Sequence, residues 1–189
     1  MTINEFDIKI CASGLQLVGA DEITSFDDET RESRICATNY AMIKRNCLQK
    51  HPWRFSIRQQ QLSKLVEKPI FDFNNAYQLP TDFLRFIGKQ NPNIEHQVFE
   101  NKIYTNADPL FIAMQYDVAA QYFPAYFQYY LVLELSGFFA TSLLEDEGKQ
   151  QTMAALAKNQ LIFAKSIDSQ NGTVSVIPEE LFSLTNSRM

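Results

Sequence analysis

The chain has little glycine and none of the short patterns that build common active sites. Its six glycines in 189 residues never cluster, and a phosphate-binding loop needs clustered glycines so that backbone N–H groups can reach the anion. The patterns G-x-S-x-G, H-E-x-x-H and C-x-x-C do not occur. We therefore expect no catalytic residue, no cofactor and no cofactor-binding residue, and we predict that the protein is not an enzyme.

The sequence also lacks any block of positive charge. It contains 17 Lys and Arg residues against 22 Asp and Glu, a formal net charge of −5. Proteins that grip phosphates present a basic patch, so we do not expect specific DNA binding. The acidic groups Asp27–Asp28 and Glu145–Glu147 fall at an expected helix start and in an expected turn. Carboxylates at such places cap helices and stay solvated, so they are not predicted to act as an acid–base pair.

Cysteine is scarce, and Cys11, Cys36 and Cys47 are scattered. An odd, dispersed set is typical of buried thiols in a reducing compartment, and no leader pattern is visible, so we expect synthesis in the cytoplasm. Cys36, Cys47 and His51 share one face of an expected helix. A structural zinc needs four ligands, which Cys11 and His96 could complete only by folding together. We predict no metal site, with Cys47 in the core and His51 at the negative end of the helix.

Only one long apolar run is present, at residues 122–144. A membrane-spanning helix needs about 20 mostly apolar residues, and this run is long enough. It contains Gln128, Ser136 and, near its centre, Glu134, whose carboxylate would be costly in lipid. We predict a buried central helix and no membrane association.

Four segments have capping residues and the 3.6-residue spacing of apolar positions that favours helices: 4–18, 28–50, 124–144 and 149–168. In the first, Thr2 and Glu5 have capping-box spacing, and Gly19 ends the helix. Ser25 or Asp27 is expected to cap the second. Pro52 ends that helix, and Pro124 opens the third at its first position. The fourth is predicted to pack through one apolar face, formed by Met153, Leu156, Phe163 and Ile167.

The middle of the chain, about residues 53–118, reads as extended segments. Residues 96–106 are predicted to form a hairpin with a turn at Glu100 and Asn101, and residues 110–118 form the strongest strand pattern. We expect a small antiparallel sheet inserted between the helix pairs, so the fold class is α+β and mostly helical. Trp53 and Phe55 are predicted to be buried where the second helix meets this sheet. Residues 1–168 are interpreted as a single domain.

The last segment, residues 169–189, differs from the rest and is interpreted as an extended C-terminal arm. Asn171 and Gly172 can release the chain from the fourth helix. A solvated tail rarely carries so many apolar side chains, so we expect this arm to dock on a partner subunit. The alternative is that it packs on its own subunit. The predicted docking residues are Val174, Val176, Ile177, Leu181, Phe182 and Leu184.

The order of several short sequence motifs along the chain indicates a known protein family. In that family a characteristic sequence motif follows the first helix, and this chain matches it with Gly19, Ile23, Ser25, Phe26 and Asp27. A Trp-aromatic pair then closes the second helix, and a Leu-Pro-x-Asp phrase follows it. The matching residues are Trp53 and Phe55 for the pair, and Leu79, Pro80 and Asp82 for the phrase, with Arg85 also fitting. Over residues 5–168 the chain resembles the tail tubular protein A, or head-to-tail adaptor, family of short-tailed phages.

This resemblance implies a structural virion protein at the head–tail interface. Such a subunit would form a ring, expected to be a dodecamer, between the portal protein and a tail nozzle similar to tail tubular protein B. The C-terminal arm is then expected to dock on the portal. DNA would pass through its lumen without specific binding. Ala20 stands where the family often has Glu, a departure that does not threaten the fold. The alternative function is a non-catalytic cytosolic binding or assembly module with a helical core.

Overall fold

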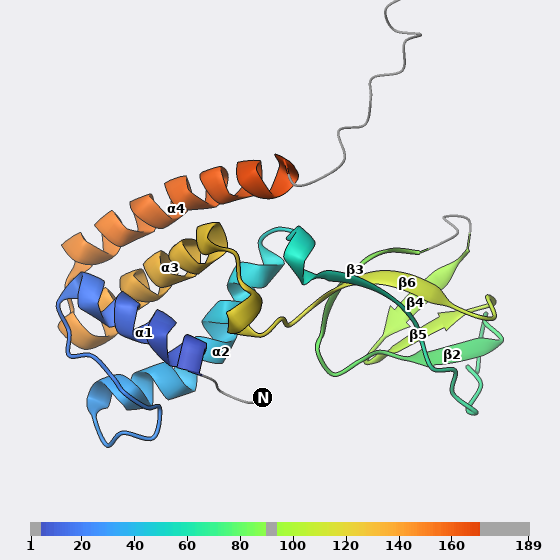
Figure 1. Cartoon of the computed structure of the whole chain (residues 1–189). Coiled ribbons are helices and arrows are strands. Elements are labelled where there is room, and N and C mark those ends of the chain that lie inside the picture. Colours follow the sequence, from blue (N-terminus) through green and yellow to red (C-terminus); the bar gives the residue numbers. More distant parts are fainter. Residues whose placement is uncertain (1–4, 90–93, 171–189) are drawn as a thin grey trace, which may run out of the picture.

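The computed structural model describes residues 5–89 and 94–170. Within them the helices gather at one end of an elongated molecule and the strands at the other (Figure 1). The helices are α1 (Glu5–Val18), α2 (Arg31–Gln49), α3 (Ala125–Leu144) and α4 (Glu147–Gln170), with short 3-10 turns η1 (Arg54–Ser56) and η2 (Ala120–Tyr122). The α+β prediction is confirmed, and the helix positions agree with those expected to within three residues. No helix among the described residues is long and apolar enough to cross a bilayer.

Helix α3 lies at the centre of the helical end and packs against α1, α2 and α4. Its apolar residues are buried on nearly all sides, as the long apolar run predicted. Helix α1 approaches closely because Gly14 lacks a side chain: a Cβ there would lie 3.2 Å from the Phe139 ring. Ser136, which is buried, donates its hydroxyl to the carbonyl oxygens of Gly14 and Val132. The polar group inside this core is therefore satisfied.

Two predicted helix starts are corrected. Helix α2 is capped by Thr30, whose hydroxyl accepts from the Ser33 amide at 3.2 Å, and not by Ser25 or Asp27. Asp28 instead folds the preceding loop, because its carboxylate accepts from the amides of Thr24 and Ser25. Pro124 precedes α3 as its N-cap, with ψ of 151°, and is not the first helical residue. The first helix ends at Gly19 as predicted, with φ of 77°, while Thr2 lies outside the described residues.

Of the four residues predicted to form the apolar face of α4, Met153 and Ile167 are partly buried, and the prediction is wrong for the other two. Leu156 and Phe163 are 43% and 57% exposed. The buried side chains of α4 are Ala157, Ala164 and Asp168, and Met153 and Leu161 are partly buried beside them. Small residues let α4 approach α3, where Gly137 faces Met153. The large apolar side chains consequently remain on the outside of the helix.

The strands form two three-stranded antiparallel sheets where a single small sheet was expected. One has the order β1 (Ile57–Gln61), β6 (Phe111–Tyr116), β3 (Phe83–Lys89); the other has the order β2 (Asn75–Gln78), β5 (Lys102–Thr105), β4 (His96–Phe99). Strands β4 and β5 form the predicted hairpin, with Glu100 in the left-handed region at its turn. A second hydrophobic core, which includes Tyr77, Ile103 and Met114, is formed by residues of both sheets.

Trp53 joins the two ends of the molecule. Its side chain is fully buried, and its ring centroid lies 5.1 Å from that of Phe127 on α3. The indole N–H donates to the carbonyl oxygen of Cys47 at 3.1 Å. Phe55 stacks on it at 6.1 Å but is only partly buried. The predicted burial is therefore confirmed for Trp53 and holds only in part for Phe55.

We predict that Trp53→Ala lowers the free energy of unfolding by about 3–5 kcal/mol, because it opens a cavity inside an aromatic cluster. Urea unfolding followed by circular dichroism measures this change. Tyr122→Ala is the control, since this aromatic side chain is 65% exposed and its loss should cost no more than about 0.5 kcal/mol. Equal effects of the two substitutions would contradict the role assigned to Trp53.

Candidate interaction surfaces

The predicted docking residues of the arm, Val174 to Leu184, lie outside the described residues. Helix α4 continues to Gln170, two residues beyond its predicted end at residue 168. The arm therefore stays a prediction. The described residues offer three other candidate surfaces, and a buried polar junction positions them relative to one another.

The residues weighed as metal ligands lie at different places. Cys11 and Cys36 share a hydrogen bond between α1 and α2. His51 faces Asp168 at 3.5 Å, and His96 packs on the Phe86 ring at 4.5 Å in the β region. Within the part of the chain that the structure describes, no three His, Cys, Asp or Glu residues gather as metal ligands would.

The thiols have the surroundings of core residues. All three are buried. Burial raises the pKa of Cys47 to about 12 and also raises the pKa of Cys11, whereas the hydrogen bond from Cys11 lowers the pKa of Cys36. A thiol whose pKa is raised by burial stays protonated and unreactive at neutral pH. Cys11 and Cys47 therefore act as small apolar side chains.

Sequence reasoning missed Asp168, which is 1% exposed. Its carboxylate accepts from the Arg54 amide at 3.1 Å and from the Tyr126 hydroxyl at 2.8 Å, which links the end of α4 to η1 and α3. One signal could have revealed it. A carboxylate in the last turn of a helix opposes the helix dipole, so its presence there calls for a partner elsewhere.

Two more buried polar residues hold the strands against the helices. The Gln115 amide on β6 donates to the carbonyl oxygens of Leu48 and His51 at 2.7 and 2.8 Å. Lys44, 2% exposed, lies 2.8 Å from the Asp117 carboxylate just after β6. Breaking a buried pair of this kind leaves an uncompensated charge, so these contacts constrain how the two ends of the molecule are placed.

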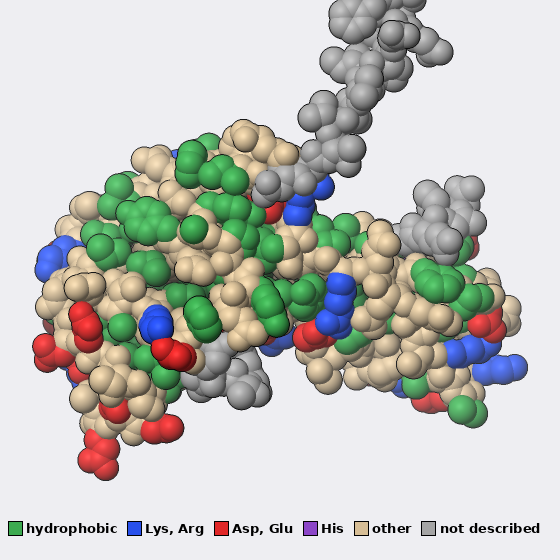
Figure 2. Space-filling model, viewed as in Figure 1, with side chains coloured by type: hydrophobic (Ala, Val, Ile, Leu, Met, Phe, Trp, Pro, Cys, Tyr) green, Lys and Arg blue, Asp and Glu red, His purple; other side chains and the backbone are tan. Residues whose placement is uncertain are grey.

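The first candidate surface is an apolar face over α1, α3 and α4, which we define by Leu17, Tyr129, Leu156 and Phe163. These side chains are between 43% and 57% exposed. Lys149, Leu156 and Phe163 recur every seven residues and so share one flank of α4. Lys149 donates to the Val18 carbonyl oxygen, so this flank faces α1. Figure 2 shows hydrophobic side chains gathered over this end of the molecule.

A groove of about 490 Å³ runs along this face between α1 and α3. Leu17, Tyr129 and Val132 line it, and Lys9 is the charged residue among its described lining. The Lys9 ammonium pairs with Glu5 one turn earlier, in an exposed contact of the kind that contributes little to stability. We call this depression the α1–α3 groove.

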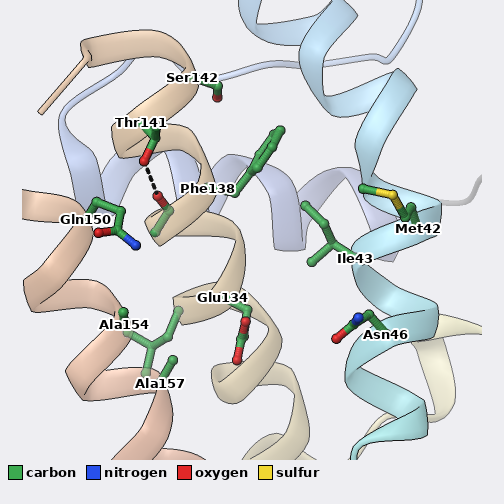
Figure 3. A pocket seen from close by; sticks show the side chains of 12 residues that line it. Met42, Ile43, Asn46, Glu134, Phe138, Thr141, Ser142, Gln150, Ala154 and Ala157 are labelled. Carbon is green, nitrogen blue, oxygen red and sulfur yellow. Dashed lines mark hydrogen bonds between the residues drawn. The ribbon is translucent and has the colours of Figure 1, made fainter. Parts of the chain in front are cut away.

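The second candidate surface is a groove of about 440 Å³ between α2, α3 and α4. In Figure 3, Met42 and Ile43 from α2 lie across from Phe138 on α3, and Ala154 and Ala157 from α4 form the other side. Glu134 also lines it. The Glu134 carboxylate accepts from Lys50 at 2.6 Å and from the Tyr130 hydroxyl at 2.8 Å, so its charge is compensated. This α2–α3–α4 groove has no convergent set of reactive groups and resembles a docking surface more than an active site.

The third candidate surface is the segment between β1 and β2, which we call the β1–β2 loop. Its side chains Val66, Ile70 and Phe71 are 100%, 87% and 78% exposed. No other large hydrophobic side chain among the described residues is as exposed as these three. Scattered exposed apolar residues are normal, but three of them within six residues of sequence make this loop a candidate interaction surface.

Comparison with known proteins found no matching family model and no matching curated protein. Function must therefore be inferred from the residues and the geometry of the chain itself.

We predict that His51 makes stability fall in mild acid. Burial lowers the pKa of this imidazole below its ordinary 6.5, although the nearby Asp168 carboxylate opposes the shift. The unfolded chain then binds more protons than the folded one, so the free energy of unfolding decreases as the pH falls through about 6.5. Chemical unfolding across this window should give a shallower pH dependence for His51→Gln. Parallel curves for the two proteins would contradict the prediction.

Proposed function

We propose that this chain is the ring-forming head-to-tail adaptor of a short-tailed phage particle, a structural subunit of the virion and not an enzyme. The observation that carries the proposal is the place of the residues by which the chain resembles that family. These residues lie where one structural element connects to the next, so each matched motif has a structural role.

The first phrase surrounds the turn between α1 and α2. Gly19 has the positive φ that a helix C-terminus favours, and its amide donates to Gln16. Ile23 and Phe26 are buried in the helical core at 4% and 7% exposure. The Ser25 hydroxyl accepts from the Asp27 amide, which tightens the same turn. Each matched residue thus has a local reason to be the residue it is.

The remaining phrases surround the junction between helices and sheets. Trp53 fills the aromatic cluster, and Leu79 is buried in the core formed by the two sheets. Asp82 accepts a two-pronged contact from Arg58, at 2.8 and 2.9 Å. The same order of motifs at these connections supports a fold shared with the adaptor family, and the proposed function rests on this resemblance.

The charge of the chain suits a channel subunit. Each phosphate that a protein neutralises adds affinity by releasing counterions, so a basic lumen would hold DNA back. Twelve copies at −5 each would carry a net charge of about −60, which favours passage over capture. In the proposed particle the ring joins the portal protein above to a tail nozzle below.

A non-catalytic assembly module of the host cytoplasm is the second candidate. The exposed apolar face favours it equally, because such a face would serve any protein partner. The two functions differ in stoichiometry. An adaptor binds portal rings as a closed ring of its own, whereas an assembly module binds one partner transiently.

We predict that purified protein mixed with portal rings adds one layer of density with about twelve copies. Electron microscopy and native mass spectrometry measure the layer and its copy number. A chain ending at Gln170 should melt like the full chain, since helix α4 is then complete, but should no longer attach to portal. Full attachment of this shortened chain would contradict the docking role of Val174 to Leu184, and absence of any portal complex with the full chain would contradict the adaptor assignment.

A further inference from the structure

Two of the three buried thiols, Cys11 on α1 and Cys36 on α2, lie against each other. The Cys11 thiol donates a hydrogen bond to the Cys36 sulfur. Both side chains are enclosed by the helical core, and a thiol side chain is short, so two thiols touch only where their backbones approach closely. The third thiol, Cys47, contacts Tyr130 on α3 instead. Cys11 and Cys36 are therefore a distinct pair.

A second contact, one helical turn away, fixes the register of this pair. The Tyr40 hydroxyl on α2 donates to the Asp7 carboxylate on α1 at 2.6 Å, and both side chains are buried. Asp7 precedes Cys11 by four residues, and Tyr40 follows Cys36 by four. Residues four apart share one face of a helix, so the two helices pass each other in opposite directions at this contact. The Asp7–Tyr40 hydrogen bond thereby holds the two cysteines opposite one another.

The two thiols differ in reactivity. The hydrogen bond from Cys11 lowers the pKa of Cys36, although burial opposes the shift. Burial, together with the nearby Cys36, raises the pKa of Cys11. The thiolate is the nucleophile in thiol chemistry, so an oxidant reacts first with Cys36. Cys11 is unreactive towards reagents in solution, but its reaction with Cys36 is intramolecular and needs no encounter.

We propose that Cys11 and Cys36 form an oxidation site at which hydrogen peroxide joins α1 to α2 by a disulfide. The Cys36 thiolate attacks one peroxide oxygen, the O–O bond breaks, and the departing hydroxide takes up a proton and leaves as water. Cys36 is then a sulfenic acid. The Cys11 sulfur attacks the Cys36 sulfur and expels its hydroxide, which takes up the Cys11 proton and leaves as the second water. Two thiols thus lose two hydrogens, and one peroxide is reduced to two waters.

The bond would strengthen the weaker contact of α1. This helix packs more extensively on α3 than on α2. Local opening costs less than global unfolding, so peroxide, which is a small molecule, reaches the thiols when the α1–α2 contact opens. The pair stays reduced in a reducing cytoplasm and is oxidised when the protein meets an oxidising medium. This chemistry goes beyond the proposed adaptor role and does not depend on it.

Mass spectrometry of the full-length protein tests the modification. Native protein is treated with hydrogen peroxide and unfolded in urea, and the remaining thiols are then alkylated with N-ethylmaleimide. The expected product has lost two hydrogens, is alkylated only at Cys47, and gives a peptide pair linked between Cys11 and Cys36. Dithiothreitol should restore all three thiols. A link that involves Cys47, sulfinic acid at Cys36 without any link, or three unchanged thiols would overturn the proposal.

Serine variants separate the roles of the two sulfurs. Cys47→Ser is the matched control, because it removes a buried thiol outside the pair, and it should form the link as fast as the unaltered protein. Cys11→Ser should stop at the sulfenic acid of Cys36, which dimedone captures, since the introduced hydroxyl can still donate to Cys36. Cys36→Ser should leave Cys11 unlabelled. Equal dimedone labelling of these last two variants would refute the reaction order.

Thermal melting gives a second measurement. The oxidised chain should melt roughly 5–10 °C above the reduced one, because the bond closes a segment of about 25 residues in the unfolded chain. Peroxide should not raise the melting temperature of Cys36→Ser, and melting of each reduced variant checks that its fold is intact. An oxidised chain that melts below the reduced one would show that the thiols are not positioned for the bond, and would overturn the proposal.

Discussion

Burial of helix α3 on nearly all sides is the constraint on which the rest of the structure depends. A helix that is apolar on nearly all sides must be covered by neighbouring elements, and α1, α2 and α4 cover α3. Each neighbour meets that demand differently. Helix α1 does so through Gly14, α4 through Ala157 and Ala164, and α2 through the Lys50–Glu134 ion pair at the edge. Within α3 the Ser136 hydroxyl and the Glu134 carboxylate both have hydrogen-bond partners, and a satisfied buried polar group favours one arrangement of the core.

That arrangement leaves the strands to be attached at a single end of the bundle. The attachment uses aromatic packing around Trp53 together with buried polar contacts of Gln115, Lys44 and Asp168. Apolar packing alone tolerates sliding, whereas a buried amide or carboxylate is satisfied in one geometry only. Aromatic packing and buried polar contacts together hold the β1–β2 loop far from the helical surface.

The sequence predicts most of the fold because its helices carry local signals. Periodic apolar positions and stop residues such as Gly19 located all four helices, and the Glu100 turn located the hairpin. It could not predict which face of α4 is buried, because the helix buries the small side chains of Ala157 and Ala164 in place of its large apolar ones. Asp168 was missed because its partners lie 42 and 114 residues away. The sequence also did not indicate the exposed β1–β2 loop, because the exposure of Val66 depends on the tertiary structure.

The position of the single tryptophan has a spectroscopic consequence. Trp53 lies where the helices meet the sheets, surrounded by Phe127, Tyr126 and Tyr130 and shielded from water. Indole emission shifts with the polarity around the ring, so the fluorescence of the whole protein reports on this one place. Exposure of Trp53 between the helices and the sheets would shift the emission to longer wavelength, whereas binding or a conformational change at the distant β1–β2 loop would leave it unchanged. The chain thus carries its own optical probe of how its two ends are held together.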